Sequence, residues 1–325
     1  MHFGQLKRRE FIAVLAGAAV VWPLAARAQQ AYRLGILTGR GRREPNFVAF
    51  FDELRQFGIV EGQHLTVDPR GFEVREDQFP ALANELVASG VNVILAAGDP
   101  AITAAQAATR STPVLGISGD MVGAGLVRSL ARPSGNITGI SILATELNAK
   151  RLELLMEVFK DTRRMAALSD PRDTTSRHLE ILRNEAHSHG VELAVYEAST
   201  PEEILPAIDA ASRAGAQALN VLATALFSFN SRRIVEHTLS LRLPAIYQWP
   251  EIADDGGLLA YGPRITQIYR QLARQLVKLM RDVKPADIPV EQPTVFELVV
   301  NLKTAQAMGL DLPATFLTRA DEVIE

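Results

Sequence analysis

Three aspartates stand directly after short apolar runs that are typical of buried strands. Asp99 and Asp170 each precede a proline, and Asp120 ends the run PVLGISGD. An aspartate in an apolar cleft binds an amine, and the helix that begins after Asp99 would aim its positive end at a carboxylate. Asp120 is the better amine candidate, since nothing else in SGDMVGAG needs an acid. For Asp99 the alternative is a plain helix N-cap, and for Asp170 a turn with the following proline.

The ends of the other apolar runs supply further candidates, because parallel strands end at one edge of a sheet and ligands bind beyond that edge. The small and polar residues there are Thr38, Gly98, Ser118 and Thr224. The aromatic residues Tyr247, Trp249 and Tyr261 could wall a pocket, although aromatic residues in such places more often belong to the core.

The residues that most enzyme mechanisms need are missing or badly spaced. The chain has no cysteine, which excludes a thiolate nucleophile, cysteine-ligated zinc and a disulfide framework. His178 and His189 share a helical face but would lie about 16 Å apart along the axis, too far for one metal. No Gly-x-Ser-x-Gly sequence or P-loop occurs, and TGRGRREP lacks the third glycine of a dinucleotide fingerprint. The sequence therefore predicts no catalytic residue, no metal and no cofactor.

The elements that must position these residues alternate between strand and helix patterns. The almost wholly apolar strands indicate parallel sheets covered on both faces. In the first half, strands are expected at residues 32–38, 64–70, 91–98, 112–118 and 136–141, and helices at 44–58, 78–90, 99–110 and 122–131. In the second half, strands are expected at 164–170, 191–197, 216–223 and 244–249, and helices at 145–159, 176–190, 201–215 and 229–242. No flexible linker separates the halves, so we expect several short crossings, with the tail packed onto one or both.

The first 28 residues are typical of a cleaved export signal. Lys7, Arg8 and Arg9 precede an apolar run, and Ala26-Arg27-Ala28 forms a small-residue cleavage site. The arginine pair resembles the twin-arginine signal, with general secretion as the alternative route and a retained membrane anchor as the alternative fate. Cleavage near Ala28 would leave the protein free in the periplasm, since no cysteine is present for lipid attachment.

Composition and charge exclude several partners. The 325 residues are 47% hydrophobic and 22% charged, which indicates a globular chain long enough for two domains. Loss of the leader changes 34 basic and 37 acidic residues to 30 and 36, and the net charge from −3 to −6. A chain of that sign lacks the electrostatic footprint of a nucleic-acid binder.

Three stretches carry a resemblance to a known family. GLVRSLARPSGNITGIS at 125–141, PADIPVEQPTVFELVVNLKTAQAMGL at 285–310 and RADEVIE at 319–325 resemble the ABC-transporter substrate-binding family of the tryptophan/tyrosine type. This family is a branch of the type I periplasmic binding proteins. The resemblance implies an α/β fold with two doubly wound parallel-sheet lobes joined by crossover hinge strands. It places residues 31–142 plus about 260–288 in the N-terminal lobe, and 143–259 plus about 289–325 in the C-terminal lobe.

The resemblance also implies a function and a site. It implies a monomeric, periplasmic component of an importer that closes over an amino acid or another small carboxylate, aromatic ones included, and delivers it to an inner-membrane permease. A ligand-reporting sensor subunit and an exported α/β enzyme are the alternatives. The chain departs from the family pattern at Met121, where proline is common, and at Ser134, where a second glycine is common. By position, the implied ligand-binding residues are Thr38, Gly98, Asp99, Ser118, Asp120, Asp170, Thr224, Tyr247 and Tyr261.

Overall fold

A computed structural model describes residues 31–325, so the predicted export signal at 1–28 lies outside the described residues. The first sheet has the strand order β2-β1-β3-β4-β5, and all its neighbours pair in parallel. Every residue of β3, β4 and β5 is buried, because helices cover both faces of the sheet. The strands are β1 (Tyr32–Leu37), β2 (Leu65–Val67), β3 (Val93–Ala97), β4 (Val114–Ser118) and β5 (Ile137–Ser141).

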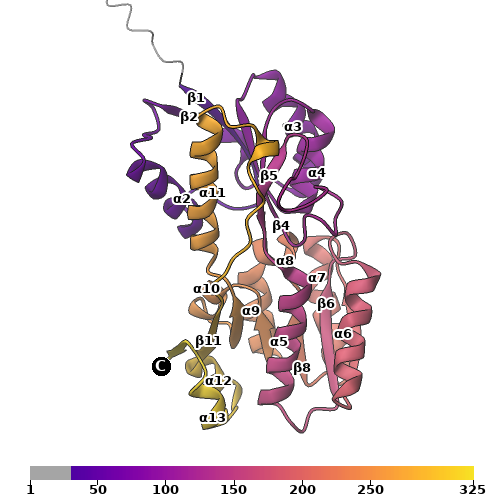
Figure 1. Ribbon diagram of the computed structural model, residues 1–325. Coiled ribbons are helices and arrows are strands. Elements are labelled where there is room, and N and C mark those ends of the chain that lie inside the picture. The colour runs from indigo at the N-terminus through magenta and orange to yellow at the C-terminus, as the bar shows by residue number, and fades with distance from the viewer. Residues whose placement is uncertain (1–30) are drawn as a thin grey trace, which may run out of the picture. The chain divides into compact units, whose positions relative to one another are not determined.

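Four helices cover this sheet. Figure 1 shows α2 and α11 side by side on one face and α3 with α4 on the other. The helix α11 comes from the last fifth of the chain, yet it packs against α2 from the first fifth. The helices are α2 (Pro45–Gln56), α3 (Phe79–Ala88), α4 (Asp99–Ala108) and α11 (Ile265–Met280), with short 3₁₀ turns η1 (Pro69–Gly71) and η2 (Glu76–Gln78). We call this sheet with its four helices the first lobe.

The second sheet has the order β12-β11-β10-β9-β8-β6-β7 and is parallel except where β10 meets β11. With its helices we call it the second lobe. Its strands are β6 (Arg164–Ser169), β7 (Glu192–Glu197), β8 (Ala218–Val221), β9 (Ala245–Tyr247), β10 (Leu259–Gly262), β11 (Glu297–Asn301) and β12 (Glu322–Ile324). Its helices are α5 (Ala144–Val158), α6 (Ser176–Ser188), α7 (Pro201–Arg213), α8 (Ala225–Phe229), α9 (Ser231–Ser240), α10 (Pro250–Asp254), α12 (Leu302–Met308) and α13 (Ala314–Leu317).

The chain crosses between the lobes three times. It passes from β5 to α5 at 142–143, from β10 to α11 at 263–264, and back to β11 through η3 (Pro285–Asp287) and residues 288–296. The predicted fold of two parallel-dominated sheets in an α/β arrangement is confirmed. The predicted lobe boundaries stay a prediction, because residues 32–325 group as one compact unit.

The helix predicted at 122–131 is wrong. Residues 121–134 form a series of turns, in which the backbone N–H groups of Leu126 and Val127 both donate to the carbonyl of Met121. Gly125 has a φ of 71°, which breaks a right-handed helix. Leu126 and Val127 are buried nonetheless, so their near-helical spacing reflects packing against the first sheet rather than a helix.

A glycine allows β5 to run beside β4 at the first crossing. Gly139 has a φ of 142°, and a Cβ there would lie 1.9 Å from the carbonyl oxygen of Gly116. Any side chain at this position would therefore push the two strands apart.

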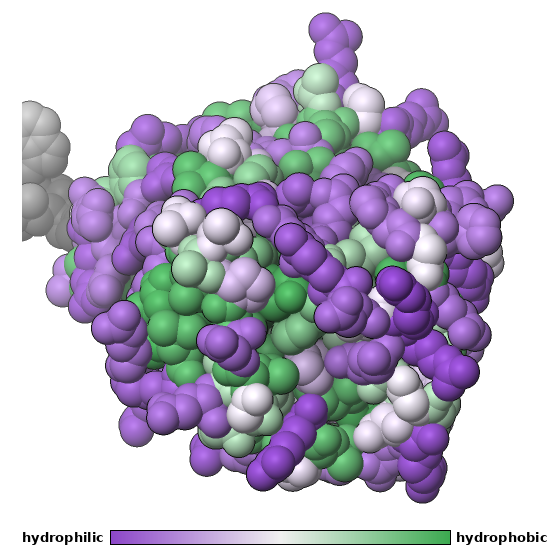
Figure 2. Space-filling view, turned by 90° about the horizontal axis from the view of Figure 1, so that it is seen from below, coloured by the Kyte–Doolittle hydropathy of each residue, from purple (hydrophilic) through white to green (hydrophobic). Residues whose placement is uncertain are grey.

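The surface is mixed in character. Figure 2 shows hydrophilic side chains surrounding several apolar areas on the face seen from below. None of the helices in residues 31–325 combines the length and the apolar character that a membrane crossing requires.

Candidate functional site

A cavity of about 690 Å³ lies between the two lobes. Its wall includes the ends of β3 and β4 in the first lobe and the residues that follow β8 and β9 in the second. The volume falls within the roughly 300–1,000 Å³ that is usual for small-molecule sites. The cavity thus lies at the sheet edge where the strand-end rule places a ligand.

Five of the nine predicted binding residues line this cavity. They are Gly98, Asp99, Ser118, Asp120 and Thr224. The other four, Thr38, Asp170, Tyr247 and Tyr261, do not line it. Whether the five contact a ligand stays a prediction, but their position at the wall is what that role requires.

Thr38 and Asp170 are fully buried behind the wall. The Thr38 hydroxyl accepts a hydrogen bond from the backbone N–H of Arg40 at 3.1 Å. Asp170 accepts two hydrogen bonds from the guanidinium of Arg172, at 3.0 and 2.6 Å, and a third from the backbone N–H of the same residue. Both side chains are therefore occupied in shaping loops.

Tyr247 lies in the interior of the second lobe, and the half-buried Tyr261 packs against the core of the same lobe. The Tyr247 hydroxyl shares a 2.8 Å hydrogen bond with that of Thr238, and burial raises the Tyr247 pKa. The Tyr261 ring packs near Phe296 at 6.4 Å between centroids, and its carbonyl accepts a 2.8 Å hydrogen bond from Arg151. For these two tyrosines the alternative interpretation holds, in which aromatic residues near strand ends belong to the core.

Asp99 points its carboxylate toward the cavity without capping a helix. The N-cap of α4 is Gly98, with a φ of 99°, and Asp99 is the first helical residue, so the predicted N-cap role is wrong. One carboxylate oxygen of Asp99 is buried and has no hydrogen-bond partner. Burial raises the pKa of Asp99 to about 6, the charge of Asp120 adds to the rise, and Ser118 and the Gly119 backbone oppose it. The Asp99 carboxylate is therefore partly buried without a cation to balance its charge.

A second, half-buried acid, Asp173, lines the same cavity from the opposite lobe. It also has a carboxylate oxygen without a partner. Burial raises its pKa to about 8, and the negative charges of Asp99, Asp170 and Glu76 contribute in that order. The strand-end pattern does not extend to this residue, because it lies three positions beyond Asp170, inside the following loop.

Asp120 has a local structural role. It is exposed, and its carboxylate accepts hydrogen bonds from the backbone N–H groups of Val122 and Gly123, at 3.1 and 2.9 Å. The expectation that nothing in this stretch needs an acid is therefore wrong, since the carboxylate holds the turn.

An aromatic wall lies at another part of the cavity and was missed apart from Trp249. Phe229, Trp249 and Tyr269 line the cavity together with Arg40. Arg40 lies 5.7 Å from the Phe229 ring centre and donates to the Ser228 hydroxyl at 2.5 Å. The Trp249 indole N–H donates to the same hydroxyl at 2.9 Å. Tyr269 lies far along the sequence on α11, so no strand-end pattern could have found it.

Contacts between the lobes show that the cleft is closed. Arg172 of the second lobe forms a 2.6 Å ion pair with Glu76 of the first, while holding Asp170 of its own lobe. A Cβ on Gly98 would lie 2.4 Å from the Cβ of Ala225 across the cleft. The absence of a side chain at Gly98 thus lets the lobes approach.

A hydrogen-bond donor also faces the cavity. The Ser118 side chain is 1% exposed and lies on the wall; its hydroxyl is close enough to lower the pKa of Asp99 but forms no hydrogen bond of normal geometry. The first turn of α5 also lines the cavity, but the Ala144 backbone N–H donates to the Gly119 carbonyl at 3.0 Å and the Glu146 carboxylate occupies the same turn. His178 lines the cavity but is uncharged at neutral pH, because burial and nearby Arg151 lower its pKa to about 4. Within residues 31–325, no group of three or more metal-ligating side chains is found.

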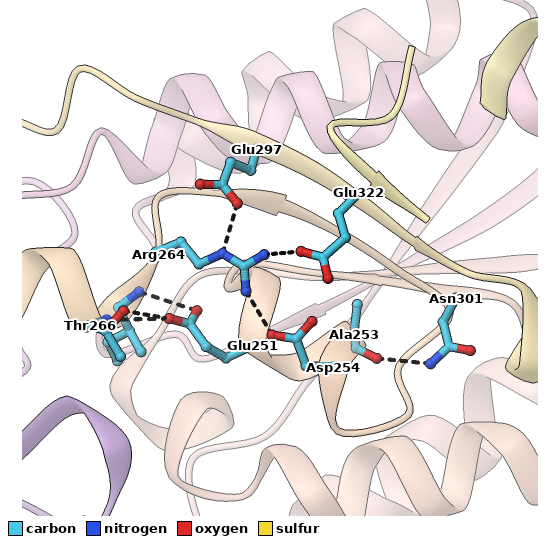
Figure 3. A network of polar contacts seen from close by, with 9 residues as sticks. Glu251, Ala253, Asp254, Arg264, Thr266, Glu297, Asn301 and Glu322 are labelled. Carbon is cyan, nitrogen blue, oxygen red and sulfur yellow. Dashed lines mark hydrogen bonds and ion pairs between the residues drawn. The ribbon is translucent and has the colours of Figure 1, made fainter. Parts of the chain in front are cut away.

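A cluster of charges holds the crossing between β10 and α11. Figure 3 shows Arg264 reaching three carboxylates from separate elements of the second lobe. It donates to Glu297 at 2.7 Å and to Asp254 at 2.6 Å, and it pairs with Glu322. Glu251 accepts hydrogen bonds from the first backbone N–H groups of α11. We call Arg264 with Asp254, Glu297 and Glu322 the hinge cluster.

Comparisons with known proteins agree on the fold. A family model described as ABC transporter substrate binding protein matches residues 45–324. A curated "Tyrosine-binding protein" from Clostridioides difficile is 24% identical over 268 residues, which cover 80% of this chain and 75% of that protein.

Solved structures resemble the chain over nearly its whole length. A conserved domain protein from Vibrio cholerae has a TM-score of 0.81 at 20% identity, covering 91% of this chain and 99% of that one. An ABC domain in complex with L-Trp from Streptococcus pneumonia has a TM-score of 0.80 at 22% identity, covering 90% and 100%. At these identities the likeness shows the fold, and the cavity's own residues must carry the chemistry.

Proposed function

The chain belongs to the ABC transporter substrate-binding protein family, and we propose that it is the periplasmic component of an importer that closes over an aromatic amino acid. The observation that carries this proposal is the chemistry of the cavity wall. It holds two acids without a cation, a hydroxyl without a partner, and an aromatic wall.

Each part of an aromatic amino acid has a matching group in the cavity. The α-ammonium needs an acid, which Asp99 and Asp173 provide. The carboxylate needs a hydrogen-bond donor, which the Ser118 hydroxyl provides. The ring needs a flat apolar surface, which Trp249 and Phe229 provide. The names of two similar proteins, one tyrosine-binding and one solved with L-Trp, support the same ligand class.

Capture and release follow from hinge motion. The three crossings allow the lobes to separate, and closure buries the ligand where water no longer competes for its charges. The predicted export signal supports a periplasmic location, and the family supports delivery to a membrane permease. The proposal includes no chemical step, since the wall provides groups that bind and none that form a nucleophile–base pair.

A thermal-shift screen of the chain from residue 29 onward tests the ligand class. The probes are L-tyrosine, L-tryptophan, L-phenylalanine, their analogues without the amino group, and neutral sugars. A ligand at 100 times its Kd adds about 2.7 kcal/mol of stability, which raises the melting temperature measurably. We expect one or more aromatic amino acids to do this. A shift with neutral sugars and none with amino acids would refute the proposal.

Two serine variants show whether binding uses the cavity. Ser118→Ala removes the unpartnered hydroxyl, so we expect affinity to fall about tenfold, the usual effect of losing one hydrogen bond to a charged group. Ser188→Ala, at an exposed position at the end of α6, is the matched control and should bind as the wild type does. Equal affinities in both variants would place the ligand elsewhere.

A further inference from the structure

Closure brings two carboxylates of like charge together from opposite lobes. Asp99 begins α4 in the first lobe, and Asp173 follows β6 in the second. Both line the closed cavity, and each keeps one buried oxygen without a hydrogen-bond partner. Asp99 and Asp173 belong to different lobes, so the two side chains come close only when the cleft closes.

Neither acid of this pair forms an ion pair with another of the described residues. Asp173 also faces Asp170 and Glu76, and the nearest cation, Arg172, is already paired with those two acids. Asp99 faces Asp120, another acid. Of the other two wall arginines, Arg40 is held by Glu44 and Ser228, while Arg177 is exposed, pairs with neither acid and does not contribute to the pKa shift of either. Every charge that shifts the pKa of either acid is therefore negative.

Two adjacent, partly desolvated carboxylates cannot both remain charged at low cost. In an open cleft water solvates each of them, whereas in the closed cleft burial and mutual repulsion raise the pKa of both. Closure of the empty cleft must therefore either take up a proton or tolerate the repulsion.

We propose that Asp99 and Asp173 form a gate that opposes closure of the empty cleft, and that a ligand ammonium group placed between them opens this gate. The charged pair favours the open form, and a positive charge between the two carboxylates removes the repulsion. The gate selects ligands with a protonated amine, and it keeps an empty protein from adopting the closed form that a ligand-loaded one presents. The ligand part of this inference rests on the proposed function, and the gate itself does not.

The sign of the pH effect follows from linkage. Because closure raises the pKa of both acids, the closed empty form binds more protons than the open one. Acid therefore favours empty closure, and the preference is lost as the pH rises through about 6 for Asp99 and about 8 for Asp173. A bound ammonium replaces the proton, so closure with ligand should persist in mildly alkaline solution.

The first experiment uses no ligand. The radius of gyration of the chain from residue 29 onward is measured by small-angle X-ray scattering from about pH 5 to about pH 9. Trp249 emission is recorded in parallel, since Trp249 lines the cavity and the other tryptophan, Trp22, lies in the predicted leader. We expect the wild type to expand as the pH rises.

Three variants decide the cause of that expansion. Asp99→Asn and Asp173→Asn each keep the side-chain shape and remove one charge, so both should expand less than the wild type; burial of the remaining acid leaves a smaller pH effect. Asp161→Asn, at an exposed position outside the cavity wall, should expand as the wild type does. Superimposable profiles for the wild type and both cavity variants would overturn the gate. Two variants are used so that a folding defect in one leaves the other decisive.

The second experiment adds L-tyrosine or its analogue without the amino group, 3-(4-hydroxyphenyl)propionate, at about pH 8. L-Tyrosine should compact the wild type, and the analogue should bind at least tenfold more weakly. In Asp173→Asn this preference should shrink. Equal compaction by both probes would overturn the role of the amine. If no amino acid binds, the proposed function fails, while the ligand-free experiment still decides the gate.

Discussion

The hinge cluster and the acid pair use the same side-chain chemistry with opposite results. At the hinge, Arg264 meets three carboxylates that come from α10, β11 and β12. In the cleft, Asp99 and Asp173 repel each other, and neither forms an ion pair with another described residue. Carboxylates that are paired with an arginine hold the chain segments in place, whereas carboxylates without a cation can bind a positively charged ligand group.

This difference follows from where each cluster lies. The hinge cluster joins elements of one lobe at the point where the chain leaves for the other, so it must hold in both the open and the closed form. The acid pair exists only when the lobes meet. Substitutions at the hinge should therefore change stability, and substitutions at the cleft should change closure and affinity.

The largest effect is expected at the hinge cluster. Arg264→Gln leaves three carboxylates facing one another without a cation, and the arginine is only 20% exposed. Loss of a buried partner costs about 3–5 kcal/mol, and the partial exposure of the carboxylates reduces this to about 2 kcal/mol. Urea unfolding followed by circular dichroism measures the change. Arg264→Lys keeps the charge but not the planar guanidinium with its several N–H donors, so it should lower the free energy of unfolding by about half as much.

The surface pair Arg232–Glu236 provides the matched control for this prediction, since the Arg232 side chain is 90% exposed. Arg232→Gln should change the free energy of unfolding by less than about 0.5 kcal/mol. If Arg264→Gln is no more destabilising than Arg232→Gln, the cluster does not stabilise the hinge.

Tyr247 lies near the cleft, and its hydroxyl already has a hydrogen-bond partner. It therefore belongs with the paired groups of the hinge cluster rather than with the unpaired acids. Tyr247→Phe removes the hydrogen bond to Thr238, which keeps its bond to the Val235 carbonyl. We expect stability to fall by about 1 kcal/mol with no change in ligand affinity. Trp249→Phe, at the cavity wall, should instead weaken the binding measured by calorimetry. A loss of affinity in Tyr247→Phe would mean that Tyr247 contacts the ligand after all.

Much of the fold follows from local pattern, because buried parallel strands must be apolar along their whole length. The strand ending at Ala97 shows this, since all five of its residues are apolar and buried. The pattern at 122–131 misled because Leu126 and Val127 are buried by turns with helix-like spacing. Periodicity reports which side chains are buried and leaves the backbone path open.

The site was predictable only where one strand end determines it. The strand-end rule placed Ser118 and Asp99 on the wall, because each lies within two residues of its strand. It could not find Asp173 or Tyr269, whose positions depend on a loop and on a helix from the end of the chain. It also could not distinguish Asp99 from Asp170, since only the structure shows that Asp170 already has Arg172.

The smallest effect is expected at Glu76, whose carboxylate is paired like those of the hinge cluster at one oxygen and unpaired like those of the acid pair at the other. One of its carboxylate oxygens pairs with Arg172 across the cleft at 2.6 Å, and the other is buried without a partner. Burial raises the pKa of Glu76, and Arg172 opposes the rise.

Glu76→Gln removes the attraction between the lobes, so the affinity for the ligand should fall about threefold, as for a partly exposed ion pair. The direct contact with Arg172 outweighs the weaker repulsion between Glu76 and Asp173. Asp77→Asn, at the exposed neighbouring position, is the control and should leave affinity unchanged. Tighter binding in Glu76→Gln would show that repulsion dominates, and Glu76 would then belong with the acid pair of the gate.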